Sequence, residues 1–361
     1  MNNFIRGFRY LKAARTISGG SNCNCHDDTV INFPYDFGNE LQPVVNTKNP
    51  ELHLVQLIEK GYSVVGTVRS KEKGESLVAN LPKNFQYEVV SDIVKPGAFD
   101  EALKKHPEVV GFFHTASPVS MVADDVENDI IRPAIEGTKN VLSAVQQFGT
   151  NVKRFVYTSS NAAIVSPTDN KDSVVTEESW CNLGRHEVSI GLPGYKISKT
   201  YAEKEVWASS EKSSFTFNIV NPTFVFGPQA FASEAKGTLN FSADLITRLA
   251  SLKEGDEIPP MVGGFVDVRD VARAHIFAYE TELDKTRLYL FEEMFTSWLA
   301  VDIIRENFPE LASIPKGDPY TALIVGNIAQ FDNKNTKALI EPFSSVKQSV
   351  IDTVQQFLEN N

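Results

Sequence analysis

Cysteines are scarce in this sequence, and long apolar runs are absent. The 361 residues include only Cys23, Cys25 and Cys181, which cannot build a disulfide framework and indicate a reducing compartment. Cys23-x-Cys25-His26 is spaced too tightly for a tetrahedral zinc site, so we expect no metal. No apolar run approaches the roughly 20 residues needed to cross a bilayer, so we expect no membrane partner.

An excess of basic charge is also missing. The chain has 35 Lys and Arg against 46 Asp and Glu, which gives a formal net charge of −11. A nucleic-acid binder needs a basic stripe that follows the phosphates, so that class is excluded. Because 42% of the residues are hydrophobic, a chain of this length can bury a large core, in one large domain or in two lobes.

The N-terminal segment has the opposite charge bias. Residues 1–26 contain four basic residues and no acid, with apolar residues interspersed. That pattern weakly resembles a mitochondrial presequence, but we favour an extension that targets nothing. We therefore expect an atypical N-terminal extension over residues 1–45 and a cytoplasmic protein, with a mitochondrial location as the alternative.

From about residue 50, short apolar segments alternate with helical patterns. We expect strands over residues 62–68, 85–90, 109–114, 154–158 and 215–220, and helices over 50–60, 126–148 and 195–210. This alternation predicts an α/β fold with a Rossmann-type doubly wound parallel sheet. After about residue 225 the alternation weakens. We therefore expect a Rossmann domain over residues 46–225. Residues 226–361 should form mainly a smaller substrate-binding lobe, which closes over the carboxyl ends of the strands.

The segment GYKISK carries the first chemical signal. Tyr195 and Lys199 are four residues apart in a predicted helix that begins after Pro193-Gly194, so both side chains lie on one face. A phenol ionises near pH ~10, and a neighbouring ammonium lowers that pKa, which makes the tyrosine a usable general acid. The spacing alone is common by chance. Its context strengthens it, because Ser159-Ser160 follow the strand over 154–158; we favour Ser160, with Ser159 as the alternative.

The residues after the strand over 62–68 indicate which coenzyme fits. An enzyme specific for NAD tends to place Asp or Glu there, to bind the ribose 2′-hydroxyl. Here the strand is followed by Arg69-Ser70-Lys71-Glu72-Lys73. Because a guanidinium suits a 2′-phosphate, the segment predicts that the Rossmann domain over residues 46–225 binds NADP(H).

Six ordered motifs together resemble a known family. They are HTASP (residues 114–118), TSSNAA (158–163), EESW (177–180), YKISK (195–199), NPTFVFGPQ (221–229) and GGFVDVRDVARAH (263–275). Over about residues 52–360 the chain resembles the extended short-chain dehydrogenase/reductases, and within them the group of fungal methylglyoxal reductases and plant dihydroflavonol reductases. The resemblance implies an NADPH-dependent reductase of aldehydes or ketones, acting as a monomer or homodimer on a small-molecule carbonyl substrate.

The same resemblance implies roles for individual residues. Ser160 matches the serine that hydrogen-bonds the carbonyl, and Tyr195 matches the donor that protonates it as hydride arrives from nicotinamide. Lys199 matches the lysine that lowers the tyrosine pKa and holds the nicotinamide ribose. The implied cofactor contacts are Arg69 and Lys73 at the 2′-phosphate, Asp92 and Ile93 at the adenine edge, and Val225 and Ser242 elsewhere. We expect His114 to pack at a strand end, and we assign no chemistry to the acids of EESW.

One expected feature is missing. Such a reductase should have a glycine-rich turn, G-x-x-G-x-x-G/A, that brings backbone amides to the pyrophosphate. The turn should cover about residues 45–51, where the sequence reads VNTKNPE. The preceding segment LQPVV (41–45) is a poor central strand because Pro43 cannot donate to the ladder. The alternative first strand is TVINF (29–33), followed by a long loop through residues 34–49.

Three explanations compete for this departure, and two other functions stay open. We favour a misassigned exon in front of a genuine reductase; the others are a cofactor-impaired homologue and a site rebuilt by another segment. The alternative functions are an NAD(P)-dependent epimerase or dehydratase and a non-catalytic dinucleotide-binding protein. Arg69 counts against the first, and the intact Ser160, Tyr195 and Lys199 count against the second.

Overall fold

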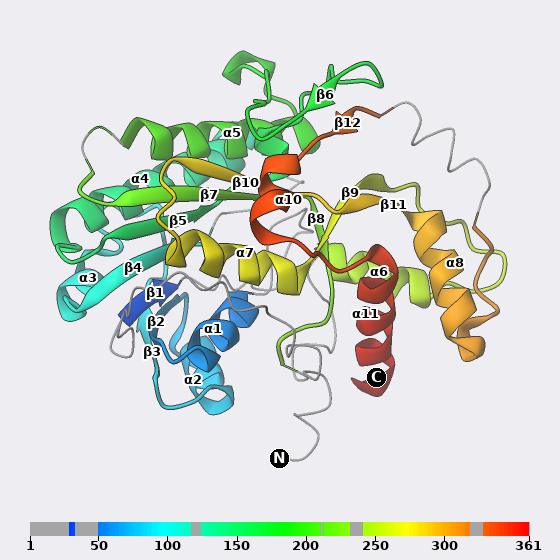
Figure 1. The fold of residues 1–361 in the computed structure, drawn as a ribbon, viewed down its shortest axis with the longest axis horizontal. Helices are drawn as coiled ribbons and strands as arrows, with labels where there is room; N and C mark the ends of the chain where they lie inside the picture. Colours follow the sequence, from blue (N-terminus) through cyan, green and yellow to red (C-terminus); the bar gives the residue numbers. More distant parts are fainter. Residues whose placement is uncertain are drawn as a thin grey trace.

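The computed structural model describes residues 29–32, 50–116, 124–209, 211, 213–231, 241–317 and 328–360. Within these residues the main sheet has seven strands in the order β10-β7-β5-β4-β1-β2-β3 (Figure 1). The strands are β1 (Thr29–Asn32), β2 (Ser63–Val68), β3 (Phe85–Val89), β4 (Val109–His114), β5 (Arg154–Thr158), β7 (Thr216–Pro222) and β10 (Thr286–Leu290). All neighbours are parallel. The strand order reverses between β1 and β4, as in a Rossmann sheet.

Helices cover both faces of this sheet. The helices are α1 (Pro50–Glu59), α2 (Lys71–Asn80), α3 (Asp100–Lys105), α4 (Arg132–Phe148), α5 (Leu192–Ser209) and α7 (Val268–Glu280). Figure 1 shows α4 and α5 on one face and α1 and α7 on the other. Strand β5 contributes side chains to the core on both faces of the sheet. Phe155 and Tyr157 pack on the α4 side, whereas Val156 packs on the side of α1 and α7. Burial on both faces explains why these strands read as continuous apolar runs.

The expected strands and helices from residue 50 onward are confirmed, with small shifts at their ends. Helix α1 ends before Gly61, whose φ of 95° is the left-handed conformation that glycine adopts most readily. Helix α5 begins at Leu192, earlier than predicted, because Pro193 falls in its first turn, where the missing N–H costs nothing. The segment over 126–148 begins with a π-helical turn, η1 (Glu127–Ile131), before α4.

The central position of the sheet is filled by β1. It pairs in parallel with both β2 and β4, and Val30 is in register with Val64 and Gly111. TVIN is therefore the first strand, and the expected extension over residues 1–45 contains a strand of the sheet. Strands β2 and β4 each have backbone N–H and C=O groups that need a partner on this side, and β1 supplies the partners for both. The β-branched residues of TVIN favour a strand at this position. The glycine-free stretch 45–49 and the Cys23-x-Cys25-His26 cluster lie outside the described residues.

A second, smaller sheet forms beside the first, with strand order β11-β9-β8. Its strands and surrounding helices are β8 (Phe224–Phe226), β9 (Val262–Asp267), β11 (Glu293–Thr296), α6 (Phe241–Ala250), α8 (Ser297–Asn307) and α11 (Val346–Asn360). The rings of Phe226, Phe265 and Phe295 pack together at its centre. Within residues 226–361, β10 joins the main sheet and α7 packs against it.

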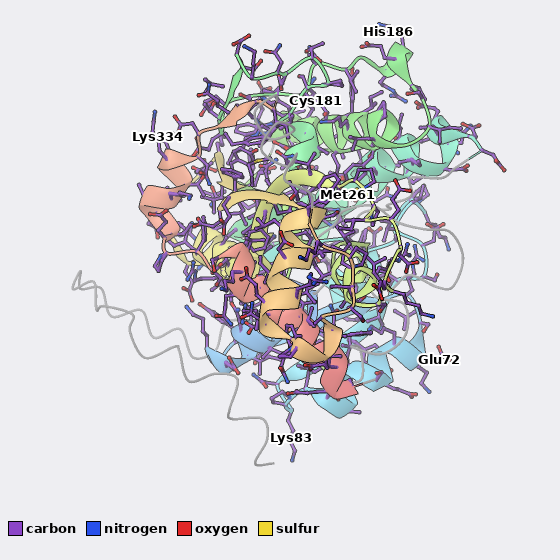
Figure 2. All side chains as sticks on the ribbon, turned by 90° about the vertical axis from the view of Figure 1, so that its right-hand side faces the viewer. Glu72, Lys83, Cys181, His186, Met261 and Lys334 are labelled. Atoms are coloured by element: carbon purple, nitrogen blue, oxygen red, sulfur yellow. The ribbon has the colours of Figure 1, made fainter. Side chains whose placement is uncertain are left out.

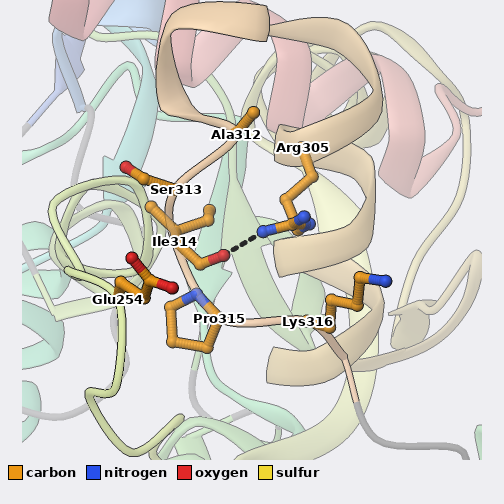
Figure 3. Close-up of a pocket in the computed structure, with 7 residues that line it drawn as sticks. All are labelled: Glu254, Arg305, Ala312, Ser313, Ile314, Pro315 and Lys316. Carbon is orange, nitrogen blue, oxygen red and sulfur yellow. Dashed lines mark hydrogen bonds between the residues drawn. The ribbon is translucent and has the colours of Figure 1, made fainter.

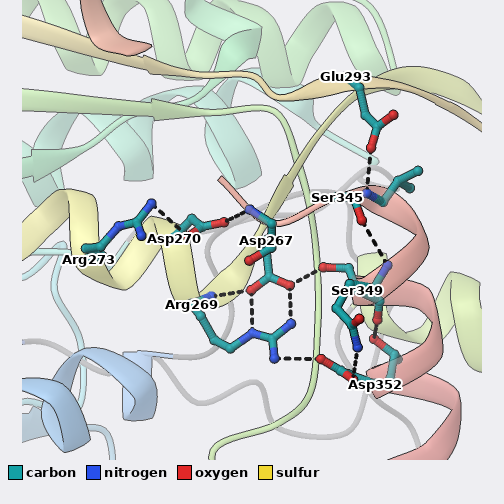
Figure 4. A network of polar contacts seen from close by, with 12 residues as sticks. Asp267, Arg269, Asp270, Arg273, Glu293, Ser345, Ser349 and Asp352 are labelled. Carbon is teal, nitrogen blue, oxygen red and sulfur yellow. Dashed lines mark hydrogen bonds and ion pairs between the residues drawn. The ribbon is translucent and has the colours of Figure 1, made fainter. Parts of the chain in front are cut away.

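A polar network ties the start of α7 to α11 (Figure 4). Asp267 caps α7 by accepting from the Arg269 backbone N–H at 2.8 Å, and its buried carboxylate also accepts from the Ser349 hydroxyl. The Arg269 guanidinium lies 2.7 Å from Asp267 and 2.6 Å from Asp352. The motif GGFVDVRDVARAH therefore holds the small sheet, α7 and the C-terminal helix together.

The described residues contain neither a membrane-spanning helix nor a cluster of metal ligands. No helix among them combines the length and apolarity of a membrane span. Among the described residues, no group of three or more His, Cys, Asp or Glu side chains could hold a metal ion. Cys181 is buried inside the fold, whereas Figure 2 shows Lys83 and Lys334 extending from the surface.

Candidate active site

Ser160 and Tyr195 meet at the carboxyl end of β5. Ser160 follows this strand and begins the short helix η2 (Asn161–Ala163), where its Oγ accepts from the Ala162 N–H at 3.1 Å. Tyr195 lies in the first turns of α5, which packs against η2. The side chains of Ser160 and Tyr195 are hydrogen-bonded to each other, and both are buried. The structure therefore favours Ser160 over Ser159, whose hydroxyl donates to Glu203 instead.

Lys199 lies one helical turn beyond Tyr195 on α5. Its Nζ is 6.0 Å from the centroid of the Tyr195 ring, and the side chain is fully buried. The structure thus places Ser160, Tyr195 and Lys199 close together.

Burial governs the titration of this site. It raises the pKa of Tyr195 above its usual value, and the hydrogen bond from Ser160 only partly opposes the effect. The predicted lowering of the tyrosine pKa by Lys199 is therefore outweighed, because the phenolate is disfavoured away from water. Burial also lowers the pKa of Lys199 to about 7, against the attraction of the Glu203 carboxylate. At neutral pH the phenol keeps its proton, and the lysine is partly charged.

His114 ends β4 close to Lys199. Its imidazole is buried and packs against the rings of Phe155 and Tyr157. Burial and the charge of Lys199 lower its pKa to about 3, so the ring is neutral. His114 is a packing residue at the strand end, as expected.

The residues that the sequence links to the coenzyme lie at the ends of β2 and β3. Arg69 follows β2 and is exposed, and Lys73 donates its backbone N–H to Ser70, the N-cap of α2, at 3.3 Å. After β3, Asp92 is exposed and accepts from the Val94 N–H at 2.9 Å. Strands β2 and β3 lie on one side of the point between β1 and β4 where the strand order reverses, and β5, which α5 follows in the chain, lies on the other side. Sheets of this type bind ligands in the crevice at that point.

The remaining predicted contacts are spread over three elements. The buried Ile93 side chain lies against Gly137 of α4, and its carbonyl accepts from Asn140 Nδ2 at 2.9 Å. Val225 is buried on β8. Ser242 lies in the first turn of α6, and its side chain lies outside the described part of the structure.

Sequence reasoning missed a buried acid beside this site. Glu203 lies one turn beyond Lys199 on α5 and pairs with Arg287 of β10 at 2.6 Å. The sequence does contain a signal for it, because Glu203 follows Lys199 by the same four-residue spacing that separates Tyr195 from Lys199. This spacing puts all three side chains on one face of the helix. The EESW segment is structural, as expected: the Glu177 carboxylate accepts from the backbone N–H of Thr336 at 2.8 Å, in the first turn of α10 (Lys334–Ile340).

A pocket of about 280 Å³ lies away from these residues, in the C-terminal lobe (Figure 3). Arg305 lines it and donates to the carbonyl of Ile314. Ser160, Tyr195 and Lys199 do not line this pocket. It therefore adds nothing to the chemistry of the candidate site.

Comparison with known proteins identifies the family. Residues 53–289 match the family described as the NAD dependent epimerase/dehydratase family. The chain belongs to this family. It is 38% identical over 325 residues to the NADPH-dependent methylglyoxal reductase GRE2 of Saccharomyces cerevisiae, covering 85% of this chain and 94% of that protein. It is 35% identical over 317 residues to the ketoreductase azaE of Aspergillus niger, covering 85% and 93%.

A solved structure from the same family has a similar fold. The crystal structure of Gre2 in complex with NADPH from Candida albicans superposes with a TM-score of 0.85 at 38% identity, covering 92% of this chain and 99% of that chain. The predicted family and the Rossmann-type α/β fold are both confirmed.

Proposed function

We propose that this chain is an NADPH-dependent reductase of small or medium aldehydes and ketones, of the methylglyoxal reductase type. The observation that carries the proposal is the buried hydrogen bond between Ser160 and Tyr195, with Lys199 one turn away. The relatives GRE2 and azaE, a methylglyoxal reductase and a ketoreductase, support the same reaction class.

The residues at the strand ends fit NADPH. Arg69 is exposed directly after β2, and Lys73 lies one turn into α2, so two cations lie where a 2′-phosphate would bind. The residues immediately after β2 are Arg69 and Ser70, so no carboxylate stands where an NAD ribose hydroxyl would be bound. Asp92 and Ile93 would hold the adenine edge, and Val225 and Ser242 would contact the coenzyme elsewhere. When bound, NADPH supplies the hydride.

The side chains of the chain itself handle the oxygen and the proton. The Ser160 hydroxyl binds the carbonyl oxygen and orients it toward Tyr195. Because Tyr195 is protonated at neutral pH, it is ready to give its phenolic proton to that oxygen as negative charge develops. The Lys199 ammonium favours the phenolate that remains, and it holds the ribose.

The wider organisation follows from the same proposal. The main sheet, most of whose strands lie within residues 46–225, would bind the coenzyme, and the lobe within 226–361 would bind the carbonyl compound. We also propose a cytoplasmic monomer or homodimer.

A direct spectrophotometric assay tests the proposal. Purified protein is mixed with methylglyoxal and either NADPH or NADH, and the loss of reduced-nicotinamide absorbance is followed. We expect turnover with NADPH and much weaker turnover with NADH. A parallel reaction with UDP-glucose and NAD examines the epimerase alternative. Conversion of the sugar without NADPH oxidation would overturn the proposal, and coenzyme binding without any turnover would support a non-catalytic protein.

A further inference from the structure

Glu203 is surrounded by hydrogen-bond donors, although it lies in the core. Its side chain is 0% exposed. Oε1 accepts from Arg287 Nε at 2.6 Å and from Trp207 Nε1 at 3.2 Å. Oε2 accepts from the Ser159 hydroxyl at 2.5 Å and from Asn221 Nδ2 at 2.9 Å. Because every partner donates, the group is held as a carboxylate.

Arg287 is itself fixed from three sides. Its Nη1 donates to the carbonyl oxygens of Glu177, at 3.1 Å, and Ser179, at 2.6 Å. Its guanidinium carbon lies 3.6 Å from the centroid of the Trp180 ring. The EESW segment therefore anchors the cation, and the cation anchors the carboxylate.

Two connections lead from Glu203 to the residues of the proposed reaction. Asn221 Nδ2 donates both to Glu203 and to the backbone carbonyl of Ser160, the latter at 3.2 Å. Ser159, the residue before Ser160, donates to the same carboxylate oxygen. The second connection is electrostatic, because the Glu203 charge lies one turn from the Lys199 ammonium on the same helix face.

We propose that Glu203 is a positioning residue, which fixes the backbone that presents the Ser160 hydroxyl and supplies the negative charge that keeps Lys199 protonated. This inference rests on the proposed reductase function and deepens it. A carboxylate that served packing alone would not need to bridge the serine turn and the lysine.

Among the described residues, the other titratable groups near Lys199 do not supply that charge. His114 on β4 is neutral, and Tyr157 on β5 and Tyr195 on α5 keep their protons because burial raises the pKa of each phenol. Arg287 on β10 is a cation.

Several charged groups on the other elements packed against α5 are held in ion pairs. Lys139 of α4 contacts Glu136 and Glu205, and Glu127 of η1 contacts Arg185. These side chains are all partly exposed. Solvent therefore screens their effect on Lys199.

Glu203→Gln tests the inference, with Glu205→Gln as the matched control. Both variants remove one carboxylate from α5, but Glu205 is 34% exposed and contacts Lys139 at 3.7 Å. We measure the pH dependence of kcat/KM and, separately, of NADPH binding by fluorescence. Without the Glu203 charge, the pKa of Lys199 falls further, so the alkaline limb of both profiles should move down by about one pH unit.

The expected fold-changes follow from that shift. Relative to the parent, kcat/KM of Glu203→Gln should drop about tenfold near pH 8 and by a smaller factor near pH 6. Glu205→Gln should keep the parent profile. An equal loss at every pH, or an unshifted alkaline limb, would mean that Glu203 is merely structural and would overturn the inference.

A second variant guards against misfolding. Glu203→Gln combined with Arg287→Met removes both buried charges. Proteins tolerate the loss of a whole buried ion pair better than a single buried charge left without its partner. A downward shift of the alkaline limb is expected here too, and its absence in a folded protein counts against the inference. If the parent binds NADPH without turnover, the proposed function fails, whereas the binding profile still tests Glu203. If the parent does not bind NADPH, both fail.

Discussion

The hydroxyl of Ser160 and the phenol of Tyr195 are hydrogen-bonded to each other, although one residue follows a strand and the other lies in the first turns of a helix. The contact exists because α5 packs against η2 at the carboxyl end of β5. It brings the two polar groups together in a buried setting. A carbonyl oxygen placed there would meet an orienting donor and a proton donor together.

Removal of the Ser160 hydroxyl should slow turnover without unfolding the protein. We expect Ser160→Ala to lower kcat/KM by roughly 10² to 10³, because a donor to the developing oxyanion is lost. Ser173→Ala is the matched control, because Ser173 Oγ also accepts from a backbone N–H in a turn, that of Asn170 at 3.2 Å. Steady-state kinetics of both variants provide the measurement. Equal activity of the two variants would show that Ser160 only shapes a turn.

Coenzyme preference should depend on Arg69. In Arg69→Gln the KM for NADPH should rise about tenfold or more, because a charge-assisted contact with the 2′-phosphate is lost, while the KM for NADH changes little. Lys71→Gln is the control: Lys71 is 72% exposed and pairs with Glu75 on the same helix. If the KM for NADPH stays unchanged in Arg69→Gln, Arg69 belongs to a solvated loop.

Acid should destabilise the fold through a buried histidine pair. His275 Nδ1 lies 3.0 Å from His53 Nε2, and its Nε2 lies 2.6 Å from the Thr158 hydroxyl. Burial lowers the pKa of His275 to about 4. Because the unfolded chain then binds more protons below about pH 6.5, stability falls as the pH falls. We expect a loss of about 2 kcal/mol from His275 between about pH 7 and pH 5.

Urea unfolding at several pH values measures this dependence. His275→Gln should have a flatter pH dependence over that range than the parent. The control His186→Gln removes a histidine that is 85% exposed and should leave the slope unchanged. A parent slope that survives in His275→Gln would assign the acid sensitivity to other groups.

The central strand provides a test of the N-terminal segment. Val30→Pro removes a backbone N–H from β1, which pairs with strands on both sides, and should destabilise the protein by about 3 kcal/mol or prevent folding. Val30→Ala keeps the N–H and should cost much less. Thermal melting of the two variants gives the comparison. Equal stability would mean that β1 is not part of the folded sheet.

Much of this architecture can be predicted from the sequence because its signals are local. The strands β2, β3, β4, β5 and β7 are short apolar segments, and the shared face of Tyr195 and Lys199 follows from helical spacing. The position of β1 is different, because two neighbouring ladders define it rather than its own four residues.

Other features depend on contacts between distant segments. Arg287 is 84 residues from Glu203, and nothing in the sequence selects that cation among the others. The pKa of Tyr195 depends on how deeply α5 is buried, so the sequence suggests a lowered value where the folded protein has a raised one. Likewise, β10 joins the main sheet after the chain has built much of the second lobe.

The most direct test of the account is a single-turnover measurement on Tyr195→Phe. Enzyme saturated with NADPH is mixed with methylglyoxal, and the absorbance of reduced nicotinamide is followed, with NADPH affinity measured separately. We expect unchanged affinity within about threefold and hydride transfer slowed by roughly 10² or more, because the proton donor is gone. Hydride transfer at the parent rate in Tyr195→Phe would contradict this expectation.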